Sequence, residues 1–306
     1  MIKNYLSLIK FSHTIFALPF ALIGFFLGLF KEVFGDIPSV GRPAGIKEED
    51  SFSGLFSTHY FILLLFVLGC MVTARSAAMA FNRWLDRKFD EKNPRTAIRE
   101  IPKGIITPKN ALAFVTINCL LFILLTWFIN SICFLLSPVA LLVILGYSYT
   151  KRFTPFCHLI LGLGLSLAPI GAYLAVTGQF DLLPILFSLA VIFWVSGFDI
   201  IYALQDEEFD LKNQLYSIPA WLGKPKALHF SELLHLCSAL SVITAGWYGG
   251  FGLWYWFGAL FFSGMLVYQH SVVKPNDLRR VNLAFMTVNG IASVVFAIFV
   301  IADLFL

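Results

Sequence analysis

The stretch LLPILFSLAVIFWVSGFDIIYALQDEEFD, residues 182–210, decides the fold. It begins with an apolar run long enough to cross a bilayer as a helix, which takes roughly 20 residues. Asp199 lies inside this run, where an unpaired carboxylate is unfavourable and usually functional. Further polar residues follow at spacings of three, four and four, so on a continued helix they share one face. The residues of this face are Asp199, Tyr202, Asp206 and Asp210.

The overall composition also places the chain in a lipid bilayer. Of its 306 residues, 58% are hydrophobic and 13% are charged, and that charged share is about half that of a soluble domain. So few charges could not cover the surface of a water-soluble protein of this size. The five cysteines form no CxxC pair, so neither a disulfide framework nor a zinc site is expected. We expect the lipid bilayer as the surroundings, no nucleic acid partner and no evident protein partner.

Apolar runs of membrane-spanning length recur nine times. They predict an all-α, multi-pass transmembrane bundle of nine helices in a single domain, 1–306. The runs lie near 11–30, 60–82, 110–130, 132–150, 156–177, 182–204, 230–249, 251–272 and 281–304. Segment 31–58, rich in Gly and Pro, is expected to be a flexible external loop.

The basic residues indicate how these spans are oriented. Segments after the second, fourth, sixth and eighth runs carry most of the Lys and Arg, whereas those after the third, fifth and seventh carry none. Basic loops remain in the cytoplasm. We therefore expect a multi-pass integral protein of a bacterial inner membrane, with a cytoplasmic N-terminus and an external C-terminus. The end of the sixth run, which carries Asp206 and Asp210, would then face the cytoplasm, as would the end of the second run.

A second acidic cluster, NRWLDRKFD at residues 82–90, ends the second run. Asn82, Asp86 and Asp90 are four residues apart and share one face of a continued helix. Hard oxygen ligands in this number suit magnesium, which binds through a few carboxylates, waters and substrate phosphates. One such cluster alone could consist of solvated helix-end charges. Two matched clusters on the same side of the membrane favour a magnesium–diphosphate site.

Several basic residues lie where they could contact phosphate oxygens. Those near the first cluster are Arg83, Arg87, Lys88, Arg95 and Arg99. Arg75, within the second run, could bind an anion in a cavity or extend toward the interface. The pair Lys151 and Arg152 could bind an anion or anchor the end of the fourth helix.

These motifs resemble those of the UbiA superfamily of intramembrane aromatic prenyltransferases. Its NxxxDxxxD motif is matched by Asn82, Asp86 and Asp90, and residues 95–104, RTAIREIPKG, resemble the RTxxRPLxxG continuation. Its DxxYxxxDxxxD motif is matched within residues 197–210, GFDIIYALQDEEFD. The 4-hydroxybenzoate polyprenyltransferase branch has similar strings at 12–24, 147–154 and 281–296, which read SHTIFALPFALIG, YSYTKRFT and VNLAFMTVNGIASVVF here. The chain departs from the branch pattern in two places: Arg83 stands where Asp is frequent, and Glu100 with Ile101 replaces Pro-Leu.

The resemblance implies a central, lipid-open cavity and a reaction in which an allylic cation substitutes an aromatic ring. It implies Mg²⁺ as cofactor, with polyprenyl diphosphate and a small aromatic acid as substrates. The implied metal ligands are Asn82, Asp86, Asp90, Asp199, Asp206 and Asp210. The implied catalytic residues are Asp199, Asp86 and Tyr202. Arg87, Arg95, Arg99 and Lys151 would bind the diphosphate, and Arg75 and Arg152 the carboxylate of the acceptor.

The expected activity is transfer of a polyprenyl group to 4-hydroxybenzoate in quinone biosynthesis. The two departures leave open a naphthoate acceptor, as in menaquinone biosynthesis. A secondary transporter is the alternative from another functional class, because it also carries acids within membrane helices. Transporters place such acids near the bilayer midplane, whereas here they cluster at one end of the spans.

Overall fold

A computed structural model describes residues 2–9, 17–35 and 57–306. The regular secondary structure of these residues is helical apart from one isolated β-bridge. The long helices are α2 (Leu18–Phe34), α4 (Thr58–Leu85), α6 (Pro108–Ile129), α7 (Ser131–Thr150), α8 (Cys157–Thr177), α9 (Leu182–Ala203), α12 (Lys224–Tyr248), α13 (Leu253–Val272) and α14 (Asn289–Phe305). The short ones are α1 (Ile2–Leu8), α5 (Arg87–Lys92), the 3₁₀ turn η2 (Leu204–Asp206), α10 (Glu207–Lys212), α11 (Ile218–Leu222) and the π-helical η3 (Leu283–Val288).

Among the described residues, seven helical segments are long and apolar enough to cross a membrane. The predicted all-α, multi-pass architecture is therefore confirmed. Of the other two predicted runs, 11–30 overlaps α2 and 251–272 matches α13. Helix α2 has 17 residues, and residues 10–16 of the predicted run lie outside the described part of the chain. Helix α13 carries Gln269, His270 and several Trp and Tyr residues, which lower its mean hydropathy.

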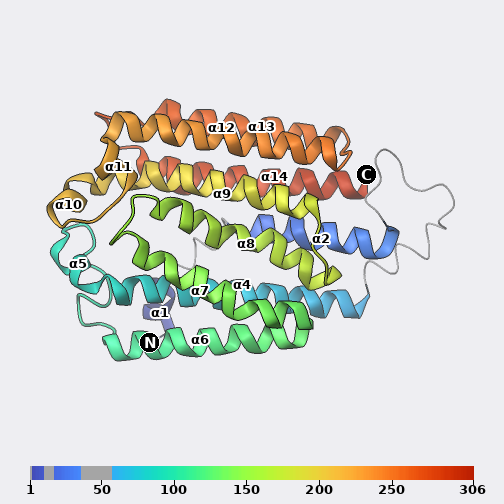
Figure 1. Cartoon of the computed structure of the whole chain (residues 1–306), viewed down its shortest axis with the longest axis horizontal. Coiled ribbons are helices and arrows are strands. Elements are labelled where there is room, and N and C mark those ends of the chain that lie inside the picture. Colours follow the sequence, from blue (N-terminus) through green and yellow to red (C-terminus); the bar gives the residue numbers. More distant parts are fainter. Residues whose placement is uncertain (1, 10–16, 36–56) are drawn as a thin grey trace.

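The long helices run side by side, and the short helices α5, α10 and α11 gather at one end of the bundle (Figure 1). Helix α9 packs between α8 and α12, while α2 packs on α8 and α4 packs on α6. The C-terminus lies at the opposite end of the bundle from α5, α10 and α11 (Figure 1). Residues 36–56, most of the predicted external loop, lie outside the described residues.

Small residues allow the central helices to approach closely. A Cβ atom on Gly24 of α2 would lie 1.9 Å from the carbonyl oxygen of Pro169 in α8. A Cβ atom on Gly162 of α8 would lie 2.5 Å from the carbonyl oxygen of Ile192 in α9. Backbone-to-backbone packing of this kind is typical of membrane helices, where small residues occupy the interfaces. It holds α9, the helix that carries Asp199, in the centre of the bundle.

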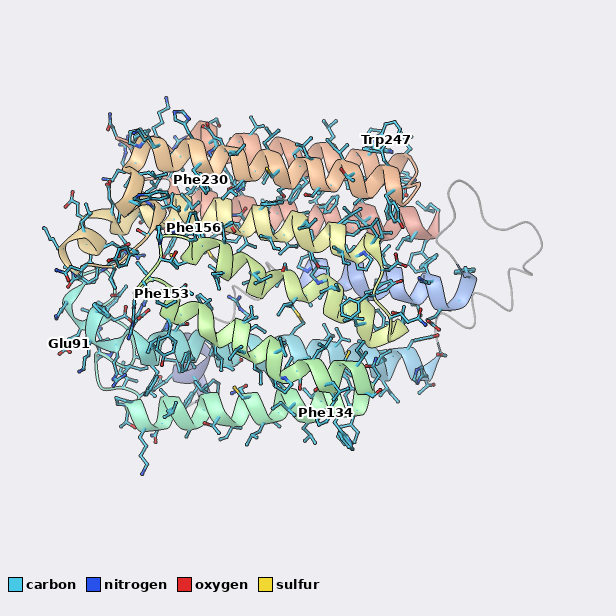
Figure 2. The ribbon with its side chains drawn as sticks, viewed as in Figure 1. Glu91, Phe134, Phe153, Phe156, Phe230 and Trp247 are labelled. Carbon is cyan, nitrogen blue, oxygen red and sulfur yellow. The ribbon has the colours of Figure 1, made fainter. Side chains whose placement is uncertain are left out.

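The outward surface of the bundle suits lipid. Leu142 of α7 is 74% exposed, and Leu120 and Trp127 of α6 are also exposed. Large aromatic side chains project at both ends of the bundle: Phe153 at the end near α5, and Trp247 at the other (Figure 2). Exposed apolar side chains over a full helix length match the hydrocarbon core of a bilayer, so the fold is that of a multi-pass membrane protein.

Candidate active site

Both acidic clusters line one cavity of about 290 Å³ at the end of the bundle that holds α5 and α10. The cavity collects twelve of the thirteen predicted site residues from α4, α5, the segment after α5, the end of α7, and α9 to α10. They are Arg75, Asn82, Asp86, Asp90, Arg95, Arg99, Lys151, Arg152, Asp199, Tyr202, Asp206 and Asp210. Arg87 is absent from the lining, because its guanidinium donates to the carbonyl oxygen of Trp84 at 2.6 Å and lies over the ring of that residue.

The spacing of each cluster suggested one continuous helix, but in the structure both helices are interrupted within the cluster. Helix α4 ends at Leu85, and Asp86 (φ −90°, ψ 6°) forms the junction with α5. Helix α9 ends at Ala203, and η2 separates it from α10. The dihedrals of Asp86 belong to the sparsely populated bridge region, which is frequent in turns and at active sites. The later acids, Asp90 and Asp210, line the cavity together with the earlier ones.

Each acid of the cavity pairs with a basic residue from another element. The Nη1 atom of Arg99 donates to both carboxylate oxygens of Asp90, at 2.7 and 2.9 Å. Lys151 Nζ lies 2.8 Å from Asp210. Arg152 donates to Asp86 at 3.2 Å. The acidic and basic groups of these pairs therefore neutralise one another. In two of the three pairs, Lys151 with Asp210 and Arg152 with Asp86, the partners lie far apart in the sequence.

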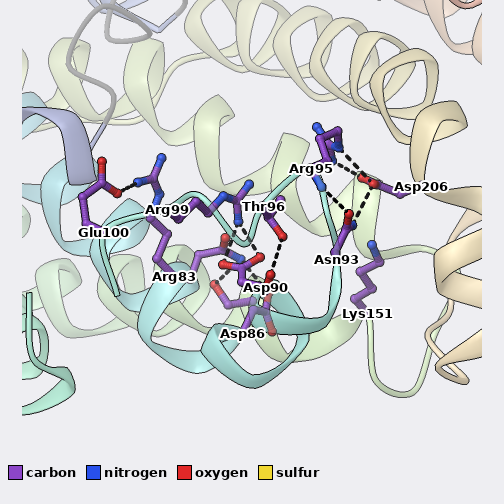
Figure 3. A network of polar contacts seen from close by, with 12 residues as sticks. Arg83, Asp86, Asp90, Asn93, Arg95, Thr96, Arg99, Glu100, Lys151 and Asp206 are labelled. Atoms are coloured by element: carbon purple, nitrogen blue, oxygen red, sulfur yellow. Dashed lines mark hydrogen bonds and ion pairs between the residues drawn. The ribbon is translucent and has the colours of Figure 1, made fainter. Parts of the chain in front are cut away.

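One of these pairs joins the two acidic clusters directly. Arg95 follows the first cluster, and its guanidinium donates to the carboxylate of Asp206 in the second (Figure 3). Arg95 Nη1 also donates to the hydroxyl of Tyr202 at 2.7 Å. Asn93 Nδ2 donates to Asp206 at 3.3 Å, and the Asn93 side chain accepts from the backbone N–H of Arg95. The segment after α5 is thereby held against the end of α9.

Burial and these pairs affect the charge of groups at the junctions outside the spans. Burial raises the pKa of the Asp86 carboxyl, and the hydrogen bond from Arg152 partly opposes this effect. Burial alone would lower the pKa of Arg95 and of Lys151, but the neighbouring carboxylates of Asp206 and Asp210 raise both values. Arg95 and Lys151 therefore remain cationic and suited to binding an anion such as diphosphate.

The donor set fits magnesium that arrives together with a diphosphate. Among the described residues, no three Asp, Glu, His or Cys side chains converge to hold a metal ion on their own. Magnesium does not require such a cage, because it binds through one or two carboxylates, several waters and substrate phosphates. The cavity offers carboxylates from both clusters, with cations beside them. This arrangement is chemically suited to a magnesium ion that is bound together with a diphosphate.

Comparison with known proteins agrees with this geometry. The profile of the UbiA prenyltransferase family matches residues 51–291. The chain belongs to this family. The 4-hydroxybenzoate octaprenyltransferase of Tolumonas auensis is 32% identical over 236 residues, which are 77% of this chain and 82% of that protein. The enzyme of the same name from Nitrosomonas eutropha is 34% identical over 240 residues, 77% of this chain and 82% of its own.

Solved structures of UbiA homologues share the fold. The apo structure of a UbiA homologue from Aeropyrum pernix K1 has a TM-score of 0.73 and 26% identity, covering 96% of this chain and 97% of that chain. A UbiA homologue from Archaeoglobus fulgidus bound to GPP and Mg²⁺ has a TM-score of 0.65 and 18% identity, covering 99% of this chain and 100% of that chain. At 18% identity, the likeness to the Archaeoglobus fulgidus protein shows a shared fold alone.

The two departures from the UbiA pattern form a pair with each other. The Nη1 atom of Arg83 donates to the carboxylate of Glu100 (Figure 3). Their side chains are 4% and 12% exposed. Ser7 of α1 donates to the other carboxylate oxygen of Glu100 at 2.5 Å. Glu100 therefore supplies the counter-charge of Arg83, a pairing that sequence reading missed because it considered each position separately.

His158 is a further residue of the site that sequence reading missed. It is the second residue of α8, and its Nδ1 atom lies 2.7 Å from Oδ2 of Asp199. A carboxylate within a membrane span usually pairs with another group. The position of Asp199 therefore indicates that a basic or hydrogen-bond-donating group lies beside it. Nothing in the local sequence singles out His158, which lies 41 residues away.

Arg75 lines the cavity with Tyr147 and Ser148. Its Nε atom is buried and has no hydrogen-bond partner among the described residues. A buried donor without a partner is unfavourable, so Arg75 is suited to bind an anionic group of a ligand.

Proposed function

We propose that the protein transfers a polyprenyl group from polyprenyl diphosphate to an aromatic hydroxy-carboxylate, with 4-hydroxybenzoate as the acceptor, in quinone biosynthesis. The observation that carries the proposal is the single cavity in which the acids and bases of both UbiA clusters meet. Proteins named 4-hydroxybenzoate octaprenyltransferase, at 32–34% identity, support this acceptor. We further propose one domain of nine spans in a bacterial inner membrane, with the cavity toward the cytoplasm.

The donor end of the cavity would bind the diphosphate. Magnesium would be held by carboxylates of the two clusters, with Asn82 beside them, and when bound it supplies electrostatic assistance to departure of the diphosphate. The ligands we propose are Asn82, Asp86, Asp90, Asp199, Asp206 and Asp210. Arg95, Arg99 and Lys151 would contact phosphate oxygens and stabilise the negative charge that develops as the allylic C–O bond breaks. Arg87 forms no part of this proposal, because its guanidinium contacts Trp84 instead.

The reacting carbon atoms would meet beside Asp199. A C–C bond forms between the allylic carbon and the ring carbon ortho to the phenolic hydroxyl, and the ring proton passes to the carboxylate of Asp199. Tyr202, fixed by its hydrogen bond from Arg95, would line the reacting centre. Apolar residues of the lining, including Leu161, Leu165 and Val195, exclude water from the cation.

The acceptor would be oriented through its carboxylate. Arg75 has an unpartnered buried Nε atom and no anionic partner among the described residues, so it is the primary candidate. Arg152 already donates to Asp86 and to the carbonyl oxygen of Leu85. Its Nε atom is buried without a partner in the described part of the chain, so it is the second candidate for this role.

The test is a transfer assay with the purified protein in lipid. Transfer of labelled polyprenyl diphosphate to 4-hydroxybenzoate should require Mg²⁺ and should be lost in Asp86→Ala and Asp199→Ala. Glu91→Ala is the matched control, because Glu91 is an exposed acid beside Asp90 that does not line the cavity. Full activity in either cavity variant, or with chelator present, would contradict the proposed site.

A naphthoate acceptor is the second candidate. Arg83 and Glu100 depart together from the pattern of the ubiquinone enzymes and form a buried pair beside the cavity. A dihydroxynaphthoate offered in the same assay distinguishes the two acceptors. A secondary transporter is disfavoured, because the acids lie at one end of the bundle. Substrate flux into proteoliposomes without any transfer product would favour it.

A further inference from the structure

The side chain of His158 connects Asp199 to the backbone of another element. Its Nδ1 atom lies 2.7 Å from Oδ2 of Asp199. Its Nε2 atom accepts a hydrogen bond from the backbone N–H of Ile218 at 3.3 Å. His158 is 3% exposed, whereas the side chain of Asp199 is 23% exposed and lines the cavity. The ring thus lies deeper in the protein than the carboxylate, at the wall of the same cavity.

The contact with Ile218 favours one tautomer of the His158 ring. A backbone N–H can only donate, so Nε2 of His158 is the acceptor in this contact. The proton of the ring is then on Nδ1, which donates it to Oδ2 of Asp199. Among the described residues, hydrogen bonds to Asp199 reach Oδ2 alone. Oδ1 is therefore the carboxylate oxygen left to act in the cavity.

The surroundings hold the ring of His158 in one orientation. Ser196, one turn before Asp199 on α9, donates to the carbonyl oxygen of His158 at 3.1 Å. Ile218 is the first residue of α11, and its neighbour Ser217 donates to Asp210 at 2.9 Å. The start of α8, the end of α9 and the start of α11 are thereby joined. The imidazole cannot rotate without breaking the contact to Ile218 or the contact to Asp199.

We propose that His158 is a positioning residue for the reaction. It holds Oδ2 of Asp199 through Nδ1–H, so that Oδ1 faces the acceptor ring and takes its proton. This inference rests on the proposed function, and it adds a residue outside both acidic motifs. Without the imidazole, the Asp199 carboxylate is free to rotate about its side-chain torsions. Loss of the partner that orients a metal-ligating side chain typically costs about 10- to 100-fold in metal affinity or activity, and Asp199 is one of the ligands we propose.

Two substitutions separate positioning from packing. His158→Leu fills the space but removes both hydrogen bonds. His158→Asn places an amide N–H where Nδ1–H was, because both groups are two bonds from Cβ, and it removes the acceptor for Ile218. His229→Leu is the control, because the side chain of His229 is 77% exposed and contacts Glu232 outside the cavity.

The experiment measures kcat and KM for both substrates, with melting temperature as a record of folding. We expect His158→Leu to lower kcat about 10- to 100-fold. His158→Asn should recover most of kcat, although it is the smaller side chain. His229→Leu should behave as wild type.

Three outcomes would overturn the proposal. Wild-type kcat in His158→Leu would show that Asp199 needs no orienting group. Equal loss in His158→Leu and His158→Asn would show that packing, and not the Nδ1 donor, is what matters. If the unmodified protein transfers a prenyl group to no aromatic acid, both the proposed function and the role of His158 are refuted. If the unmodified protein is active and the His158 variants are equally active, only the role of His158 is refuted.

Discussion

Replacing Glu100 by alanine removes the carboxylate that pairs with Arg83 next to the cavity (Figure 3). Arg83 is 3% exposed, and its guanidinium stays cationic in almost any protein environment. The substitution therefore leaves a charge buried without its counter-charge. Ser7 also loses the acceptor that ties α1 to this region.

The expected magnitude follows from the exposure of the two side chains. Removing one partner of a buried ion pair destabilises a protein by about 3–5 kcal/mol. The Arg83 side chain is 4% exposed and that of Glu100 is 12% exposed. Water can reach the position vacated by Glu100, so we expect the lower end of the range, about 3 kcal/mol. Transfer activity should fall as well, because Glu100 belongs to the segment that carries Arg95.

Denaturant unfolding of the purified protein in detergent measures the change. The pair of Lys31 and Asp181 is the matched control, because its side chains are 25% and 27% exposed. Lys31→Met should destabilise by less than about 1 kcal/mol. The double variant Arg83→Met with Glu100→Leu should regain most of the lost stability, since apolar side chains of similar volume replace a buried pair well. Wild-type stability in Glu100→Ala, or a double variant as unstable as the single one, would refute the reasoning.

Two further predictions concern regions away from the cavity. Burial alone would raise the pKa of Asp181, but the hydrogen bonds from Lys31, Tyr173 and the backbone of Leu182, with the charge of Lys31, together outweigh burial and lower this pKa. The stabilisation from this group is therefore present above the unfolded pKa of about 4 and is lost as pH falls through the folded value. Asp181→Asn should thus lower the melting temperature at pH 7, and the difference from wild type should shrink below about pH 4. A Cβ atom on Gly197 would lie 2.3 Å from the His235 ring, so Gly197→Ala should destabilise by about 1–3 kcal/mol. Gly264→Ala, with open space around its Cα, should show no such loss in the same melting experiment.

The apolar runs and the spacing of the acids predicted much of this site. Membrane-spanning runs follow from hydropathy, because a bilayer requires continuous apolar helices. The spacing of Asp199 and Asp206 predicted that both lie on one helix face, and both line the cavity. The break at Asp86 was not predictable from spacing, because a turn in the bridge region leaves no strong mark on residue type. Arg87 lies next to that break, so its direction depends on the turn, and its side chain contacts Trp84.

The sequence alone did not predict which charged residues pair with each other over long distances along the chain. His158 and Asp199 are 41 residues apart, and Arg95 and Asp206 are 111 residues apart. Neither residue of such a pair carries a local sign of its partner. The requirement that a buried charge be paired predicts that a partner exists, but only the packing of the helices selects which residue it is.

These pairs also determine how the two acidic clusters depend on each other. Arg95, from the segment after the first cluster, donates both to Asp206 and to Tyr202 of the second. Lys151, from the end of α7, pairs with Asp210. Because each base contacts an acid of another element, a change in one cluster alters the position of groups in the other. The two motifs therefore act as one unit, and substitutions in them should combine non-additively, as expected for residues that share an ion-pair network.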